Sequence, residues 1–145
     1  MNALRAAIAA IWLIVLACAG AGASAQGATT PKLALKGYDL VEYFTGNKAQ
    51  IGSANFYTDF DGMRYQFSSA RNKAAFGAEP DRYLPEFGGY CAMGISRGTK
   101  FESDPTLWKV IDGKLYVFSS PAASEAAGKD PEILARARQQ WQAMK

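Results

Sequence analysis

The chain has 145 residues, of which 49% are hydrophobic, and it holds 16 basic residues, 13 acidic residues and no histidine. Without an imidazole it cannot build a Ser-His-Asp or Cys-His catalytic group or a histidine-ligated zinc site. Its charges are interspersed, and nucleic-acid binding is not indicated because that function requires a clustered basic face.

Residues 1–25 have the features of a secretory signal peptide. Arg5 precedes an uncharged apolar run over residues 6–19, and Ala23-Ser24-Ala25 forms an A-x-A cleavage site. The apolar run is short for a membrane span, which needs about 20 residues. Two alternatives are a retained N-terminal anchor and a lipid attached at Cys18, because Val15-Leu16-Ala17 before it resembles a lipobox.

Export predicts a periplasmic or secreted protein with no membrane span after the signal is removed. Loss of Arg5 leaves 15 basic and 13 acidic residues, so the mature protein is close to neutral. Residues 26–32 are small and polar and include a proline, which predicts a flexible lead-in. Residues 33–145 then form one domain, whose first part is dense in aromatic side chains that suit strands and a core.

An internal repeat predicts two β-hairpins. The segment Asp61–Ser69 recurs as Asp112–Ser120, and each copy begins with Asp-Gly, a strong signal for a two-residue turn. Strands are expected before the turns, at Asn55–Phe60 and Leu107–Ile111, and alternating apolar residues follow them.

Each hairpin is expected to lead into a short helix. Ser-Ser supplies an N-cap in both copies, and helices are expected over Ala70–Phe76 and Pro121–Ala127. Gly77 and Gly128 are expected to end them. A lone hairpin is marginal in water, so the two hairpin–helix units should form two halves of one small antiparallel sheet.

The C-terminal segment has helical periodicity. Asp130-Pro131 is a helix start, and Ile133, Leu134, Ala137, Trp141 and Met144 recur at helical spacing. We expect this helix to pack on the sheet, which makes the domain α+β; binding of a partner along the same stripe is the alternative.

Cys91 lies in the segment Phe87–Gly94 and is the one cysteine left after signal removal. Tyr90–Ser96 can form a helix or a strand. A helix would place Cys91 in its first turn, where the helix dipole favours the thiolate. A strand would point Cys91 and Met93 to the same side, and a thiolate with a thioether is a soft pair suited to Cu(I). A buried cysteine that only packs remains open.

Several segments together resemble a YHS domain protein of the small exported bacterial kind. They are Ala34–Phe44, Tyr65–Ser69 with Asn72 and Phe76, Pro80–Pro85, Gly88–Ala92 and Trp108–Tyr116. The resemblance covers nearly the whole mature chain and implies a small α+β domain. Such domains occur as modules in some copper-transporting ATPases and hydroxylases, and metal binding has been proposed for them by similarity to cysteine-based metallochaperones.

The resemblance points to Cys91 and to Gly37-Tyr38-Asp39 with Tyr43-Phe44 as site residues. This chain departs from the metal-binding pattern because it has no histidine and a single mature cysteine, so one copy cannot build a multi-cysteine site. Met93 stands where many relatives have an aromatic residue, which would make a metal site softer.

Three functions follow as hypotheses. The first is a non-enzymatic metal-handling or cofactor-binding protein, with Cu(I) favoured, centred on Cys91 and Met93. The second is an aromatic groove near Tyr38, Asp39, Tyr43 and Tyr90 that binds a small molecule or a protein, with Cys91 structural. The third is a thiol redox protein or thiol enzyme, whose base would have to be Asp39, Glu42 or Glu86. A homodimer would bring two Cys91 side chains to one site.

Overall fold

The computed structural model describes residues 29–145. The predicted signal peptide and the alternative lipid attachment at Cys18 lie outside these residues. Within them, no helix is both long enough and apolar enough to cross a bilayer. Of the predicted lead-in, Thr29–Pro31 has no regular secondary structure and Lys32 begins the first strand.

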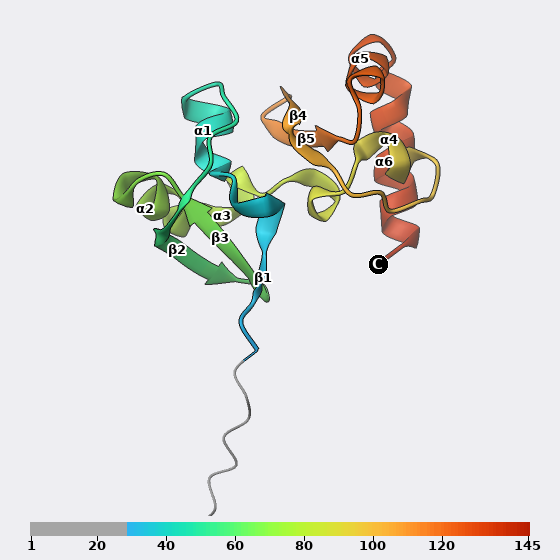
Figure 1. Cartoon of the computed structure of the whole chain (residues 1–145). Helices are drawn as coiled ribbons and strands as arrows, with labels where there is room; N and C mark the ends of the chain where they lie inside the picture. Colours follow the sequence, from blue (N-terminus) through green and yellow to red (C-terminus); the bar gives the residue numbers. More distant parts are fainter. Residues whose placement is uncertain (1–28) are drawn as a thin grey trace, which may run out of the picture.

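The elements fall into two consecutive units, which lie side by side in Figure 1. Unit 1 comprises residues 32–84. It contains β1 (Lys32–Leu33), η1 (Ala34–Gly37), α1 (Leu40–Thr45), β2 (Ser53–Phe60), β3 (Met63–Phe67), α2 (Ala70–Ala78) and α3 (Pro80–Tyr83). Unit 2, residues 85–145, contains η2 (Glu86–Gly89), α4 (Ala92–Ser96), β4 (Asp104–Ile111), β5 (Lys114–Phe118), α5 (Pro121–Lys129) and α6 (Pro131–Ala143). The predicted α+β class and both hairpin–helix units are confirmed.

The strands form two sheets where the sequence predicted one. One sheet has the order β1-β3-β2, with β1 parallel to β3, and the other is the antiparallel pair β4-β5. Single parallel bridges from Pro85 to Leu115 and from Cys91 to Val117 flank β5 in the place that β1 takes beside β3. Each hairpin therefore gains its third neighbour from its own unit, which removes the need to pair with the other hairpin.

Local sequence explains the hairpin turns and the helix starts. Asp61 and Asp112 have φ of 48° and 52°, and the glycine after each is also at positive φ, as a type I′ turn requires. Ser69 and Ser120 accept the backbone N–H of the third residue of α2 and α5, so the predicted N-caps are confirmed.

The predicted ends of these two helices are wrong. Gly77 and Gly128 lie inside α2 and α5, which continue to Ala78 and Lys129. In both cases the next helix begins two residues later with a proline, at Pro80 and Pro131. The chain turns where these prolines begin a new helix, and the helical glycines are tolerated one turn earlier.

The two units share β5 as the centre of the core. Leu115 packs with the apolar side chains of unit 1, and Tyr116 and Phe118 pack with those under α4, α5 and α6. The predicted alternation of β5 between two faces is therefore confirmed. The C-terminal helix α6 packs mainly against α4, and its Ile133, Leu134 and Ala137 join the core that covers β5.

The repeat extends far beyond the hairpins. Both hairpins have the same register, including an irregularity in which three residues of the outer strand bulge between two pairs: Ser53 pairs with Phe67 and Tyr57 with Gln66, as Asp104 pairs with Phe118 and Trp108 with Val117. Before them, η1 and η2 are turns of the same unusual conformation, each followed by Tyr and a short helix. The domain is thus two copies of one supersecondary unit, offset by 51 or 52 residues.

Candidate functional site

Two left-handed turns face each other between the units. In η1 the φ values of Leu35, Lys36 and Gly37 are 43°, 53° and 84°, and in η2 those of Phe87, Gly88 and Gly89 are 57°, 62° and 80°. A left-handed conformation costs about 1–2 kcal/mol for each residue with a Cβ. Three of the residues in these turns, Leu35, Lys36 and Phe87, are not glycine. Such conformations persist where the surrounding fold imposes them, often at binding sites.

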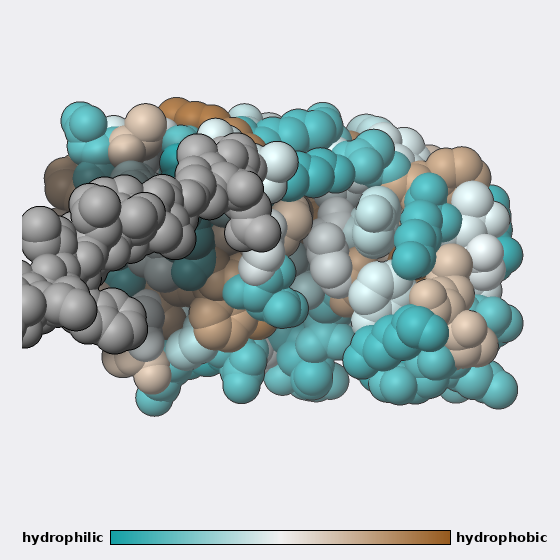
Figure 2. Space-filling view, turned by 90° about the horizontal axis from the view of Figure 1, so that it is seen from below, coloured by the Kyte–Doolittle hydropathy of each residue, from teal (hydrophilic) through white to brown (hydrophobic). Residues whose placement is uncertain are grey.

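A groove of about 740 Å³ lies between these turns. Its apolar surface comes from both units and from α6, chiefly Leu33, Leu35, Phe87, Tyr90 and Trp141. Lysines and acidic residues occupy the lining as well, among them Lys32, Lys145, Asp81 and Glu102. Figure 2 views the molecule from the lower side of Figure 1 and shows hydrophobic surface broken up by hydrophilic side chains. The volume lies within the range of about 300–1,000 Å³ that small-molecule sites occupy.

An aromatic wall closes one side of the groove. The Trp141 ring lies 6.1 Å from the Phe87 ring and 6.4 Å from the Tyr90 ring, centroid to centroid. A Cβ added at Gly88 would lie 3.6 Å from the Trp141 ring, so η2 and α6 approach closely. The Lys100 ammonium lies 5.2 Å from the Trp141 centroid, within reach of a cation–π interaction. This wall presents flat apolar surface with a positive charge at its edge.

Of the four predicted ligand-binding residues, the groove contains one. Tyr90 is half-buried and lines it. Tyr43 is buried in the core, where its hydroxyl donates to the Pro105 carbonyl at 2.8 Å and its ring meets Trp108 edge to face. Burial raises the pKa of the Tyr43 hydroxyl far above its ordinary value, with Tyr38 and Asp104 adding to the shift. Tyr38 is half-buried against the core of unit 1 and pairs with Ile51 through a β-bridge.

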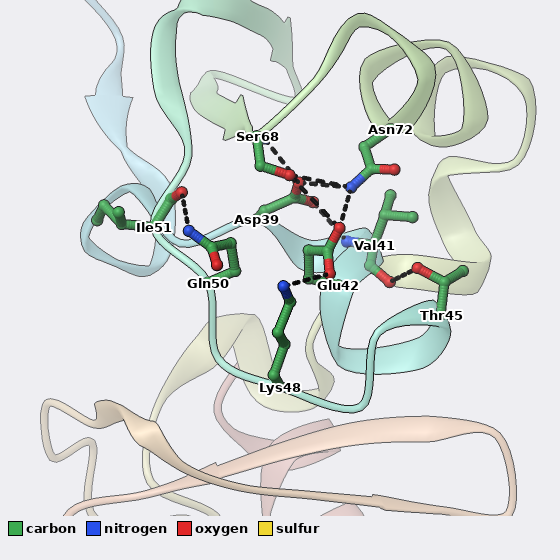
Figure 3. A network of polar contacts seen from close by, with 9 residues as sticks. All are labelled: Asp39, Val41, Glu42, Thr45, Lys48, Gln50, Ile51, Ser68 and Asn72. Carbon is green, nitrogen blue, oxygen red and sulfur yellow. Dashed lines mark hydrogen bonds and ion pairs between the residues drawn. The ribbon is translucent and has the colours of Figure 1, made fainter.

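Asp39 is fully buried at the centre of a polar network in unit 1 (Figure 3). Its carboxylate caps α1 by accepting the Val41 N–H at 2.9 Å, and it also accepts the Ser68 N–H, the Ser68 hydroxyl and the Asn72 amide, each at 2.7 Å. Glu42 accepts from the same Asn72 amide at 2.8 Å. No buried side-chain donor or acceptor among the described residues lacks a partner. The network therefore ties α1 to the start of α2, and Asp39 does not face the groove.

Cys91 and Met93 line a second, smaller pocket of about 280 Å³. Of the two conformations expected for Tyr90–Ser96, the structure has the helix, α4, which begins at Ala92. Cys91 is the N-cap residue of α4 and does not belong to its first turn. The Cys91 thiol is almost fully buried, and its sulfur accepts the Ser119 hydroxyl at 3.3 Å. Arg97 and Phe101 also line this pocket. The structure thus brings together the two sulfur-containing residues that the sequence suggested.

The donor set at Cys91 is small for a metal. Within residues 29–145 no group of three or more His, Cys, Asp or Glu side chains is placed to hold a metal ion. Cys91 and Met93 would offer two soft donors, which suits Cu(I) only at low coordination number or with donors from a second copy.

The repeat places Asp39 and Cys91 at equivalent positions. Each follows a Gly-Tyr pair after a left-handed turn and precedes a short helix, and each accepts a hydrogen bond from the first serine of the Ser-Ser pair, Ser68 or Ser119. The hairpin repeat was predicted from the sequence, whereas this extension of the repeat was not. The signal was the recurrence of Gly37-Tyr38 as Gly89-Tyr90 at nearly the same offset as the hairpins.

Comparison with protein-family models, with curated proteins and with solved structures finds no match to this chain. The resemblance to YHS domains therefore stays a prediction that rests on the motifs and on their order.

Proposed function

We propose that this protein is a binding module that holds a small apolar or aromatic molecule in the groove between η1 and η2. The observation that carries the proposal is the groove of about 740 Å³ built from two strained turns and the aromatic wall of Trp141. Both turns hold non-glycine residues in the strained left-handed conformation, and these residues form part of the groove surface. Catalysis is not part of the proposal, because the side chain that hydrogen-bonds to the Cys91 thiol is the Ser119 hydroxyl rather than a base.

A binding test can use the fluorescent dye 8-anilinonaphthalene-1-sulfonate as the probe, because it is aromatic and apolar and its sulfonate suits the lysines at the groove. We expect one saturable site and energy transfer from tryptophan to the bound dye. Leu33→Glu places a charge on the groove surface and should abolish this binding. Ile51→Glu is the matched control, because Ile51 is also an exposed aliphatic residue, at 53% against 39% for Leu33, and does not line the groove. Equal binding by both variants would contradict the proposal.

Cu(I) binding at Cys91 and Met93 is the second candidate, and the shared pocket of these two side chains favours it. A competition titration of the reduced protein against a chromophoric Cu(I) chelator tests it. One copper per monomer or per dimer, lost in Cys91→Ser and weakened in Met93→Leu, would support a soft-metal site in an exported YHS-type protein. Met63→Leu is the control thioether, since Met63 lines the groove instead. No competition by the wild-type protein would leave Cys91 a packing residue or an oxidisable thiol.

A further inference from the structure

One buried side chain of the groove has a polar group that no other described residue binds. Tyr65 on β3 is only 8% exposed, and its ring packs on Phe76 with 5.0 Å between the centroids. Its hydroxyl has no hydrogen-bond partner among residues 29–145, where no side-chain donor or acceptor is both fully buried and unpartnered. The hydroxyl is therefore accessible, and because Tyr65 lines the groove, it is accessible from there.

The repeat contains a second copy of this tyrosine, and there the hydroxyl is bound. Tyr65 and Tyr116 hold the same register position in their hairpins, so the two residues are equivalent. The guanidinium of Arg138 on α6 donates to the Tyr116 hydroxyl at 3.0 Å. Unit 2 thus uses a basic side chain to bind the group that unit 1 leaves open.

The helix that supplies this basic side chain is much shorter in unit 1. Pro80 begins α3 after α2 as Pro131 begins α6 after α5, so α3 corresponds to the start of α6. α3 ends at Tyr83, and the chain then leaves through residues 84–87, which line the groove. Unit 1 therefore has a groove beside its tyrosine where unit 2 has a basic side chain.

A carboxylate acts on the Tyr65 hydroxyl. Burial raises the pKa of Tyr65, and the charge of Asp61 adds to the shift. Asp61 lies in the hairpin turn, lines the groove and has no ion pair within the described part of the chain. A group that reaches the Tyr65 hydroxyl from the groove therefore also meets a negative charge, which favours a positively charged donor.

The other charges of the groove nearly balance, so they do not choose the sign of a ligand. The acidic residues are Asp81, Glu86 and Glu102, and the basic residues are Lys32, Lys36 and Lys145. Lys114 binds Glu86 at 2.9 Å, and Lys36 donates to the Ser103 carbonyl at 2.9 Å. Lys32 lies on β1 beside β3, so binding of an anion there is the competing outcome of the test.

From these observations we propose that the ligand of the groove carries a basic nitrogen, as an ammonium or guanidinium group on an aromatic or apolar body, which donates to the Tyr65 hydroxyl and pairs with Asp61. The ligand takes in unit 1 the part that Arg138 has in unit 2. A hydrogen bond from a charged donor is stronger than one from a neutral donor, so a basic nitrogen gains more at this hydroxyl than an alcohol does. This inference rests on the proposed function, because it names the class of molecule that the groove binds.

Calorimetric titration with three naphthalene derivatives tests the proposal on protein purified from cells that express the full sequence. At pH 7, 2-naphthylmethylamine is a cation, 2-naphthylmethanol is its neutral counterpart and 2-naphthoate is an anion. We expect the amine to bind most tightly. Tyr65→Phe keeps the ring on Phe76 and should weaken binding of the amine about tenfold or more. Asp61→Asn keeps a residue that tolerates the left-handed turn and should weaken the amine about threefold, with the alcohol unchanged.

Tyr83→Phe and Asp112→Asn are the matched controls. Tyr83 is a tyrosine of unit 1 buried to a similar degree, at 6% exposure, and Asp112 has the equivalent turn position in unit 2. Neither residue lines the groove, so both variants should bind the amine as the wild type does. Circular dichroism establishes that each variant is folded, and binding of 8-anilinonaphthalene-1-sulfonate establishes that its groove is intact.

The outcomes separate this inference from the proposed function. Binding of the dye without a preference for the amine over the alcohol would overturn the inference and leave the proposed function standing. Tighter binding of 2-naphthoate would overturn it as well, because the charged group of the ligand would then lie at Lys32. Equal amine binding by Tyr65→Phe and Tyr83→Phe would also overturn it. If neither the dye nor any of the three naphthalene derivatives binds the wild type, the proposed function fails and the inference fails with it.

Discussion

Replacing Asp39 by alanine should destabilise the fold far more than the loss of a helix cap. Asp39→Ala removes the cap of α1, which is worth about 1 kcal/mol. It also removes the acceptor for three further groups, the backbone N–H and the hydroxyl of Ser68 and the amide of Asn72. Each buried donor left without its partner costs about 1–3 kcal/mol. Asn72 keeps its bond to Glu42, so the lower end of that range applies and the expected loss is about 3–4 kcal/mol.

Asp130→Ala is the matched control. Asp130 caps α6 through the N–H of Glu132 at 2.9 Å, the same i to i+2 geometry and length as the bond from Val41 to Asp39. Asp130 is partly exposed, so its loss should cost about 1 kcal/mol. Urea unfolding, followed by circular dichroism, gives both free energies at pH 7. If the two variants lose the same free energy within about 0.5 kcal/mol, the network contributes nothing beyond the cap and the reasoning is refuted.

Three more predictions concern single positions. Burial raises the pKa of Tyr43, so the folded protein keeps this proton while the unfolded chain loses it above about pH 10. The free energy of unfolding should therefore fall as the pH rises through that range. Tyr43→Phe should make this pH dependence weaker and should lower the free energy of unfolding at pH 7 by about 1 kcal/mol. If the Asp39 and Cys91 positions are equivalent, Cys91→Asp should unfold at a lower urea concentration than the double variant Cys91→Asp with Ala123→Asn. The reason is that Ala123 is the counterpart of Asn72, so the second change supplies an amide donor like the one that binds Asp39. Equal urea midpoints would contradict the equivalence. Gly89→Ala should lower the melting temperature more than Gly113→Ala, because both have positive φ but a Cβ at Gly89 would lie 2.9 Å from the Leu35 side chain and one at Gly113 meets nothing.

Local signals in the sequence were enough to predict the hairpins, the Ser caps and the start of α6. The Asp-Gly turns, the Ser-Ser pairs and Asp130-Pro131 each act within a few residues, so no tertiary information was needed. The end of α2 was mispredicted because Gly77 is tolerated in a helix that a following proline terminates. The division into two sheets depends on single bridges such as Pro85 to Leu115, for which the sequence has no pattern.

The candidate site was harder to predict because its parts are distant in the sequence. Tyr38, Asp39 and Tyr43 were chosen as polar or aromatic residues in a motif that matched, yet Asp39 and Tyr43 satisfy their polar groups inside the core. The groove depends on the meeting of η1, η2 and α6. Trp141 was assigned to the core stripe of a helix, and nothing local distinguishes a tryptophan that packs from one that packs and also lines a groove.

The repeat also explains why one unit uses a carboxylate where the other uses a thiol. Glu79-Pro80 in unit 1 corresponds to Asp130-Pro131 in unit 2, but α3 ends after four residues because unit 2 begins there, whereas α6 continues for 13. The additional turns of α6 bury α4 under apolar side chains such as Ala137. Unit 1 has no counterpart of these turns over α1, and there the hydrogen bonds to Asp39 add to the apolar burial of Leu40, Val41 and Tyr43. At the equivalent position of unit 2, where α6 covers α4, a thiol beside a small pocket takes the place of the carboxylate and its network.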